Sequence, residues 1–542
     1  MDEFELLFAI IAGIYKIIRF FVRGIFRALG ALVGMARRAQ GGEVARAREP
    51  VRVGRAEPAP AIAEIAKATI ARLPAAAPAQ LAPQAVKDLE KQLAAIADEA
   101  DGDVARTENE PHNQPFVPTL RAIAKRARET ARTLRSAGAS ALATQAGQLA
   151  IARAAAVELE ALLEIVKLLA QQRRQPELLA LLAPSDALAA ACYQPIVDFC
   201  SSRRIPLASD RTATALDGDK LYLLRVDDPS GLALIVLPGA WSTELVWWPA
   251  IAHEIGHDFY GSVRGLDGEL RRRLRLPASG ACALPRTARL TTADLDAAVG
   301  AWQEELFADA FGTMMLGPAY VTSMSTIFAR PNRPEEACAA QRSGALFEEH
   351  PPGHVRVACA CRLLADMGYG ADADRLLAAW RARHRQPDRI YLPSSGGNWL
   401  ALAEEQVVER AYAVQETLYR TGLDALLGVP LRSIPGLDLG PREHEEARRV
   451  REALASGRRI PIRDPRLVIA GAALAWVELP DKAAVIFRAA REAALRTRPL
   501  PTIPDLDRET RNLDGPLDGE LIRDAIILDA LLTPRVPTFR RR

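Results

Sequence analysis

Two histidines and a glutamate in the segment 245–259 have the spacing of a zinc site. The segment reads LVWWPAIAHEIGHDF, and its core is the pentapeptide HEIGH, with His253 and His257 at its ends and Glu254 in second place. On an α-helix, residues four apart project from the same face, so both imidazoles can bind one Zn²⁺ ion at about 2.1 Å. Glu254 would then flank the metal, where a carboxylate can take a proton from metal-activated water. The pattern predicts metal-assisted hydrolysis.

The helix that carries this motif must present both imidazoles on one side and pack on the other. Pro249 lies four residues before His253 and suits the first turn of a helix, so we expect the helix to start there. A helix that began earlier would be kinked at this proline. The apolar side chains of Trp247, Trp248 and Ile251 are expected to bury the side that faces away from the metal.

A carboxylate from a second helix is available as the third ligand. Residues 304–312 read EELFADAFG, in which Glu305 and Asp309 are one turn apart among apolar residues. Glu305 would complete a set of two histidines and one glutamate, and Asp309 would orient a ligand imidazole through a hydrogen bond. Glu304 is the competing ligand, but it lies five positions before Asp309, which puts it off the shared face. We therefore favour Glu305.

A third segment adds histidine and arginine. The sequence EEHPPGHVRVACACRLLADMGY places His350 in a loop before a predicted helix and Arg356 in the first turns of that helix. Both side chains can donate hydrogen bonds to an oxyanion. His350 and His354 can equally be ordinary cap or surface histidines. His384 and His444 lie among arginines and glutamates and are expected at the surface.

The composition describes a globular protein and excludes some classes of function. The chain has 542 residues, of which 49% are hydrophobic and 25% charged, and its net charge is only +3. No basic stripe with interleaved aromatic residues is present, so nucleic-acid binding is not expected. Six cysteines in a chain of this length do not make a disulfide scaffold. Buried thiols in a reducing compartment fit better, and they indicate a cytoplasmic location.

The N-terminal segment 4–35 is apolar apart from a narrow charged stripe. On a helix, its charged residues gather on one side: Glu5, Lys16, Arg19, Arg23 and Arg27. The longest uncharged run, 6–15, is shorter than the about 20 residues that a bilayer requires. We therefore expect an amphipathic helix lying in the plane of a membrane surface, peripheral at the inner face of the membrane. The alternative is that this helix packs on other protein.

The remaining pattern indicates a mainly α fold with a small β-sheet, an α+β class. Two β-like runs, 220–227 and 231–239, suggest a hairpin directly before the HEIGH helix. Residues 101–118 are predicted as a loop, and so is the glycine-containing segment 393–399. Further helices are predicted at 85–99, 119–202, 291–316 (which opens with a capping-box pattern), 354–367, 372–384, 399–426, 442–456, 480–496 and 518–533.

The expected domain organisation places the metal motif in the middle of the chain. The predicted order is a membrane-associating amphipathic helix (1–38), an Ala/Pro-rich linker with short helices (39–118), a helical region (119–205), a zincin-like metallopeptidase core (206–385) and a C-terminal helical region (386–542).

Together, the three motif segments resemble the gluzincin clan of zinc metallopeptidases. The likeness is greatest to the membrane-associated CaaX-prenyl-endopeptidase and heat-shock-type endopeptidases, which carry HExxH, then a Glu-x-x-Ala-Asp helix, then a His-Pro-x-x-x-x-Arg segment. This chain has HEIGH, Glu305-Leu-Phe-Ala-Asp309 and His350-Pro-Pro-Gly-His-Val-Arg356 in that order. The segment EELFADAFGTMMLGP is also similar to the second motif of the ImmA/IrrE-type peptidases. The likeness covers roughly 220–370.

The resemblance implies a role for each matched residue. It implies zinc ligands at His253, His257 and Glu305, with Glu254 as general base. Asp309 would form a hydrogen bond to a ligand, and His350 and Arg356 would lie near the substrate carbonyl. It also implies that the strand 231–238 is the upper edge strand, which pairs with an extended peptide. Two features depart from the family. The integral members of the family have several transmembrane helices, whereas this chain offers only an amphipathic N-terminal segment. In addition, Asp258 follows the second histidine where an uncharged residue is usual.

The expected function is a zinc-dependent metalloendopeptidase that hydrolyses peptide bonds of a protein or peptide substrate at a membrane surface, with Glu254 as general base. The alternative is a membrane-tethered scaffold or binding protein whose zincin domain is vestigial or structural.

Overall fold

The computed structural model describes residues 83–137, 146–217, 221–226, 231–278, 282–285, 291–329, 337–384, 388–458, 460, 462 and 464–495. The chain divides into two compact units, Met1–Gln171 with Asp505–Arg542, and Gln172–Pro504. The expected membrane-associating helix, the linker up to residue 82 and the helical pattern at 518–533 lie outside the described residues. The domain boundaries expected from the sequence stay predictions.

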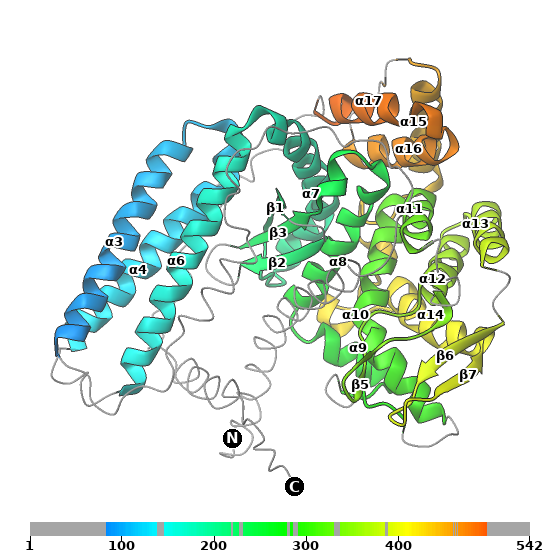
Figure 1. The fold of residues 1–542 in the computed structure, drawn as a ribbon, viewed down its shortest axis with the longest axis horizontal. Helices are drawn as coiled ribbons and strands as arrows, with labels where there is room; N and C mark the ends of the chain where they lie inside the picture. Colours follow the sequence, from blue (N-terminus) through cyan, green and yellow to red (C-terminus); the bar gives the residue numbers. More distant parts are fainter. Residues whose placement is uncertain are drawn as a thin grey trace, which may run out of the picture. The chain divides into compact units, whose positions relative to one another are not determined.

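In the first unit the described residues form long helices. These are α3 (Pro83–Thr107), α4 (Val117–Ala137) and most of α6 (Ala146–Arg174), with the short 3-10 helix η1 (Pro111–Phe116) between α3 and α4. Helix α3 packs against α4 (Figure 1). The expected loop at 101–118 is wrong in its first half, because α3 continues to Thr107. Two of its acidic residues form ion pairs there, Asp101 with Arg128 of α4 and Asp103 with Arg106.

The second unit contains a small mixed sheet of β1 (Arg211–Leu216), β2 (Tyr222–Val226) and β3 (Leu232–Leu237), in the order β1-β3-β2. The predicted pairing of the two β-like runs is confirmed, since β2 is antiparallel to β3. Strand β1, which the sequence analysis missed, runs parallel to β3 on its other side. The expectation that 231–238 is an edge strand is therefore wrong. All six residues of β3 are buried, as is typical of an apolar central strand.

The other elements of the second unit are mostly helices. They are α7 (Pro176–Arg203), η2 (Gly239–Ser242), η3 (Leu245–Trp247), α8 (Ala250–Ser262), α9 (Leu266–Leu274), α10 (Thr292–Leu316), α11 (Pro318–Phe328), β4 (Arg342–Ser343), β5 (Leu346–Phe347), α12 (Gly353–Asp366), α13 (Gly370–Arg383), β6 (Arg389–Pro393), β7 (Trp399–Ala403), α14 (Glu404–Arg420), η6 (Asp424–Leu426), η7 (Leu431–Ser433), α15 (Pro441–Ala455), α16 (Pro465–Glu478), η8 (Pro480–Lys482) and α17 (Ala483–Leu495). The expected class, mainly α with a small β component, is confirmed.

Helix α10 lies at the centre of this unit and positions the site. It is buried along nearly its whole length, as expected of a helix enclosed by others. It packs against α8, α11, α12 and α14 (Figure 1). The capping box predicted at its start is present, with the Thr291 side chain accepting from the Asp294 backbone N–H. Helices α8, α10 and α12 carry the three motif segments.

One predicted helix, 399–426, is wrong at its start. Its first five residues form β7, which pairs antiparallel with β6. The polar turn between them, 394–398, contains Gly397 at a φ of 82°, a left-handed conformation that glycine adopts without strain. This turn reverses the chain and lets Leu400 and Leu392 bury the same face of the hairpin, while Trp399 stays exposed. The predicted helix begins only at Glu404.

One further expectation concerns the burial of the cysteine thiols. All six cysteines are free and buried, as the sequence predicts. Burial raises the pKa of the Cys192 thiol to about 12. Among the described residues, no helix is both long and apolar enough to cross a membrane.

Candidate metal centre

Helix α8 presents the two histidines as the spacing predicts. Pro249 is the residue directly before the helix, which begins at Ala250. The rings of His253 and His257 lie with their centroids 4.6 Å apart, and their Nε2 atoms are 3.1 Å from each other. Of the three apolar residues expected to pack behind the motif, Trp248 and Ile251 are fully buried and Trp247 is partly buried.

Glu305 of α10 points its carboxylate at both imidazoles. Its Oε2 lies 3.4 Å from Nε2 of His253, and its Oε1 lies 3.4 Å from Nε2 of His257. In the described part of the chain, these three residues are a group that can hold a metal ion, with ligand atoms all within 4.8 Å of one another. The carboxylate favoured from the sequence as the third ligand is thus brought to the histidine pair.

The spacing and the burial of this group fit a tetrahedral metal ion. Ligands at about 2.0–2.1 Å from a tetrahedral ion are separated from one another by about 3.3–3.4 Å, close to the distances that Glu305 makes here. The Oε2 atom of Glu305 is buried and accepts no hydrogen bond. Burying an ionised carboxylate is costly unless a cation compensates it, and Nη1 of Arg356, 3.3 Å from Oε2, supplies part of that compensation. Nitrogen and carboxylate donors of this kind suit Zn²⁺, and three protein ligands leave one position for water or substrate.

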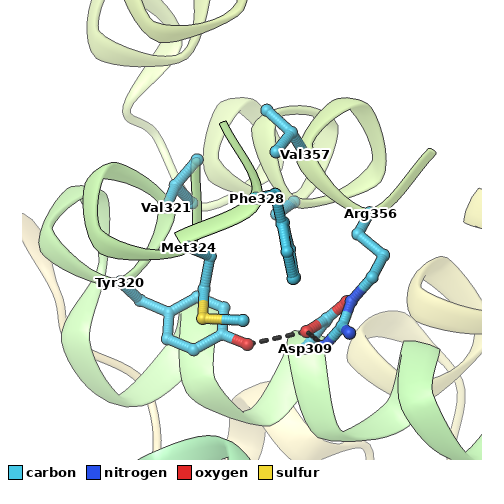
Figure 2. Close-up of a pocket in the computed structure, with 8 residues that line it drawn as sticks. Asp309, Tyr320, Val321, Met324, Phe328, Arg356 and Val357 are labelled. Carbon is cyan, nitrogen blue, oxygen red and sulfur yellow. Dashed lines mark hydrogen bonds and ion pairs between the residues drawn. The ribbon is translucent and has the colours of Figure 1, made fainter. Parts of the chain in front are cut away.

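Behind His253 lies a second layer of polar contacts. Asp309, one turn after Glu305 on α10, places Oδ1 3.2 Å from Nδ1 of His253. Arg356 of α12 donates to both oxygens of Asp309, from Nε and Nη2, at 2.7 Å each. Tyr320 of α11 donates its hydroxyl to Oδ1 of Asp309 at 2.7 Å (Figure 2). Three groups from α10, α11 and α12 therefore form one hydrogen-bonded cluster beside His253, and Asp309 is the member that the other two share.

Glu304, which the sequence analysis considered as a competing ligand, has a different contact. Its Oε1 lies 3.2 Å from Nδ1 of His257, while Glu305 faces the Nε2 atom of the same ring. Neutral imidazole that binds a metal through one nitrogen donates from the other, and carboxylates are frequent acceptors. Helix α10 thus supplies a carboxylate to the Nδ1 atom of each histidine, Asp309 for His253 and Glu304 for His257.

His350 and Arg356 both reach the group, but in different ways. His350 lies in the loop before α12, and its Nε2 is 3.3 Å from Oε1 of Glu305. Its side chain is 41% exposed, so it faces the solvent side of the group. The guanidinium of Arg356 is 7% exposed and stacks over the ring of Phe328 at 4.6 Å. Arg356 donates two hydrogen bonds to Asp309, and its Nη1 lies 3.3 Å from Oε2 of Glu305, so it holds both carboxylates in place.

The charged groups shift one another's proton affinity. Burial alone lowers the pKa of the His253 imidazole, but the carboxylates of Asp309 and Glu305 outweigh burial and raise the pKa to about 9. For Glu305, burial acts to raise the pKa, and the neighbouring His350, His257 and Arg356 hold it well below its ordinary value. Asp309 behaves in the same way, with Arg356 as the main opposing charge. Both carboxylates are therefore ionised at neutral pH and are acceptors for cations.

The remaining histidines lie elsewhere. His354 is fully buried, with Nε2 2.9 Å from Glu404 and Nδ1 accepting from the indole N–H of Trp380, so it is a core residue and not a cap or surface histidine. The expected surface positions of His384 and His444 are wrong. His384 is buried against Trp380, with ring centroids 4.0 Å apart. The side chain of His444 is only 12% exposed.

Asp258, the departure from the family pattern, points away from the ligand group. It is fully buried and accepts hydrogen bonds from the hydroxyls of Tyr193 and Ser209. These partners come from α7 and from the segment before β1. Asp258 therefore anchors α8 to its neighbours.

Sequence analysis missed the contribution of Tyr320 and of two glycines. Tyr320 follows the motif segment by eleven residues and carries no pattern that predicts its contact with Asp309. Gly256 and Gly312 lie where a Cβ would meet neighbouring atoms at 2.8 Å and 2.4 Å. Glycine within a predicted helix was the available signal, because it costs helix stability and often marks a close approach.

Comparison of the chain with models of protein families, with curated proteins and with solved structures finds no match.

Proposed function

We propose that the protein is a zinc-dependent metalloendopeptidase of the HExxH gluzincin type. The observation that carries this proposal is the convergence of His253, His257 and Glu305, from two helices, on one point. The order of the three motif segments supports the same assignment, and so does the acceptor that each imidazole has at its Nδ1 atom. The proposed substrate is a protein or peptide, presented at a membrane surface that residues 4–35 bind.

Bound zinc would supply Lewis acidity, which polarises the scissile carbonyl and lowers the pKa of water toward about 7. Glu254 lies next to His253 on α8 and is 7% exposed. Within the described residues its carboxylate makes no hydrogen bond or ion pair. It is therefore free to take a proton from the attacking water and to return that proton to the leaving amine. His350, the exposed member of the group, is placed to donate a hydrogen bond to the substrate carbonyl.

Two features favour this reaction over a purely structural zinc site. Structural zinc is generally held by four protein ligands, whereas this group has three among the described residues. A structural site also has no need of a carboxylate such as Glu254, which lies beside a ligand and has no hydrogen-bond or ion-pair partner among the described residues. The alternative function, a membrane-tethered scaffold with a vestigial or structural zincin domain, gives Glu254 no catalytic role.

The decisive variant is Glu254→Gln in the full chain, with Glu416→Gln on the exposed face of α14 as the matched control. Zinc content, thermal unfolding and cleavage of a mixed library of unfolded peptides and membrane-bound proteins would be measured. We expect one zinc per chain in every form, cleavage by the wild type and the control that a chelator abolishes, and at least a 100-fold loss of rate in Glu254→Gln. Zinc binding without cleavage by the wild type would favour the structural alternative.

A further inference from the structure

The nitrogen of His253 that faces away from Glu305 has two oxygen neighbours. Oδ1 of Asp309 lies 3.2 Å from Nδ1, and the hydroxyl oxygen of Tyr320 lies 3.3 Å from it. Asp309 holds the guanidinium of Arg356 on both of its oxygens. An ionised carboxylate only accepts hydrogen bonds, so the 2.7 Å contact between Tyr320 and Asp309 is a donation from the tyrosine.

This donation fixes what the tyrosine oxygen offers to the histidine. A phenol has one proton to donate, and here that proton goes to Asp309, so the lone pairs of the Tyr320 oxygen face Nδ1 of His253. Both neighbours of Nδ1 are then acceptors, and Nδ1 must carry the ring proton. In the neutral form that a metal requires, the ring has its lone pair on Nε2, the atom that faces Glu305. A neutral histidine with Nδ1 protonated is the tautomer that binds metal through Nε2.

The position of Tyr320 is built into the packing of α10 and α11. Its side chain is 1% exposed and its ring lies against Gly312 of α10, where a Cβ would come within 2.4 Å of the ring carbon Cε2. Figure 2 shows the hydroxyl directed at Asp309 beside an apolar pocket lined by Val321, Met324 and Phe328. A glycine at 312 is therefore required for the ring to reach Asp309.

We propose that Tyr320 is a positioning residue of the metal centre, whose hydroxyl bridges Asp309 and His253 and holds His253 in the tautomer and orientation that offer Nε2 to the metal. The inference rests on the metal site of the proposed function. Tyr320 touches neither the metal position nor the substrate in this role, and it acts through His253.

The test compares Tyr320→Phe with Tyr193→Phe. Both tyrosines are buried and donate to a buried aspartate, but Tyr193 reaches Asp258, whereas Tyr320 reaches Asp309, the neighbour of His253. Zinc affinity of the folded full chain would be measured by competition with a chromophoric chelator, and the visible spectrum would be recorded after loading with Co²⁺. We expect Tyr320→Phe to weaken zinc binding by about 10-fold or more and to change the Co²⁺ spectrum, whereas Tyr193→Phe changes neither.

Equal zinc affinities and equal Co²⁺ spectra for Tyr320→Phe and the wild type would overturn the inference. If Tyr320→Phe does not fold, Gly312→Ala provides a second variant, since it displaces the ring without removing the hydroxyl, and the same loss of affinity is expected. A wild-type protein that binds no zinc or Co²⁺ would instead refute the proposed function, so the two failures are distinguishable.

Discussion

Gly256 of α8 lies directly against Ala308 of α10. A Cβ on residue 256 would come within 2.8 Å of the Ala308 Cα, a distance that real Cβ atoms essentially never show, and within 3.0 Å of the Phe311 Cβ. Gly256 stands between the two histidines of the motif, and Ala308 stands between Glu305 and Asp309. This helix contact therefore sets the distance from the imidazoles to the carboxylate.

Replacing Gly256 by alanine is expected to separate the two helices. Overpacking a buried contact costs about 1–3 kcal/mol, which exceeds the gain of about 1 kcal/mol in helix propensity. We expect a lower free energy of unfolding in urea and weaker zinc binding. The control is Gly268→Ala in α9, where the nearest atom is the flexible end of Arg272 at 3.4 Å. That variant should be stabilised by up to about 1 kcal/mol, and a similar gain in Gly256→Ala would contradict the prediction.

Glu304 is expected to support His257 without being a ligand. Removing its carboxylate in Glu304→Ala leaves Nδ1 of His257 without the acceptor at 3.2 Å, and loss of such a partner generally weakens metal binding by about 10–100-fold. Glu304→Gln keeps an acceptor oxygen and should lose less. Glu409→Ala, an exposed glutamate in α14, serves as control. Chelator competition measures all three, and a complete loss of metal from Glu304→Ala would make Glu304 a ligand after all.

The pair of Asp309 and Arg356 separates stability from metal binding. Arg356→Met leaves the buried Asp309 carboxylate without its main cation, which is expected to lower the free energy of unfolding by about 3–5 kcal/mol. In the double variant Asp309→Leu with Arg356→Met, neither charge of this pair remains, and part of that loss should be regained, although the buried Glu305 still loses its ion pair with Arg356. Zinc affinity should stay low in the double variant, because it lacks the Asp309 carboxylate beside Nδ1 of His253. The exposed pair of Arg375 and Asp372 is the control, with an expected effect below about 0.5 kcal/mol for Arg375→Met.

How much could be predicted from the sequence depends on the range of the interaction. The spacing of His253 and His257, the helix start after Pro249 and the capping box at Thr291 are local patterns, and each is present in the structure. Glu305 was distinguished from Glu304 by its face on the same helix, which is also local.

The interactions that were missed join residues far apart in the chain. Strand β3 is central because β1 pairs with it, and no local pattern marks 211–216 as its partner. Arg356 was expected to face the substrate, yet its donors meet Asp309, a residue 47 positions earlier. Such pairings are decided by how α10 and α12 pack, and helical periodicity states only which face of each helix is buried.

Glu269 of α9 provides a test at acidic pH that is independent of the metal. Its carboxylate accepts from the backbone N–H groups of Asp424 and Ala425, at 2.8 Å each, and from Arg273 at 2.8 Å. These contacts tie α9 to the start of η6, which follows α14.

Burial alone raises the pKa of Glu269, but the two backbone donors and Arg273 outweigh it and lower the pKa below its ordinary value of 4.5. A depressed folded-state pKa stabilises the protein above the unfolded value and loses that effect as pH falls through the folded one. Glu269→Gln should therefore be about 1–3 kcal/mol less stable than the wild type at pH 7, and the difference should shrink below pH 4.5 as the wild-type carboxyl takes up a proton. Urea unfolding at a series of pH values measures this, with Glu409→Gln as the exposed control. A difference that stays constant down to pH 3 would mean that the charge of Glu269 does not contribute, because only the charged form is stabilised by these three donors.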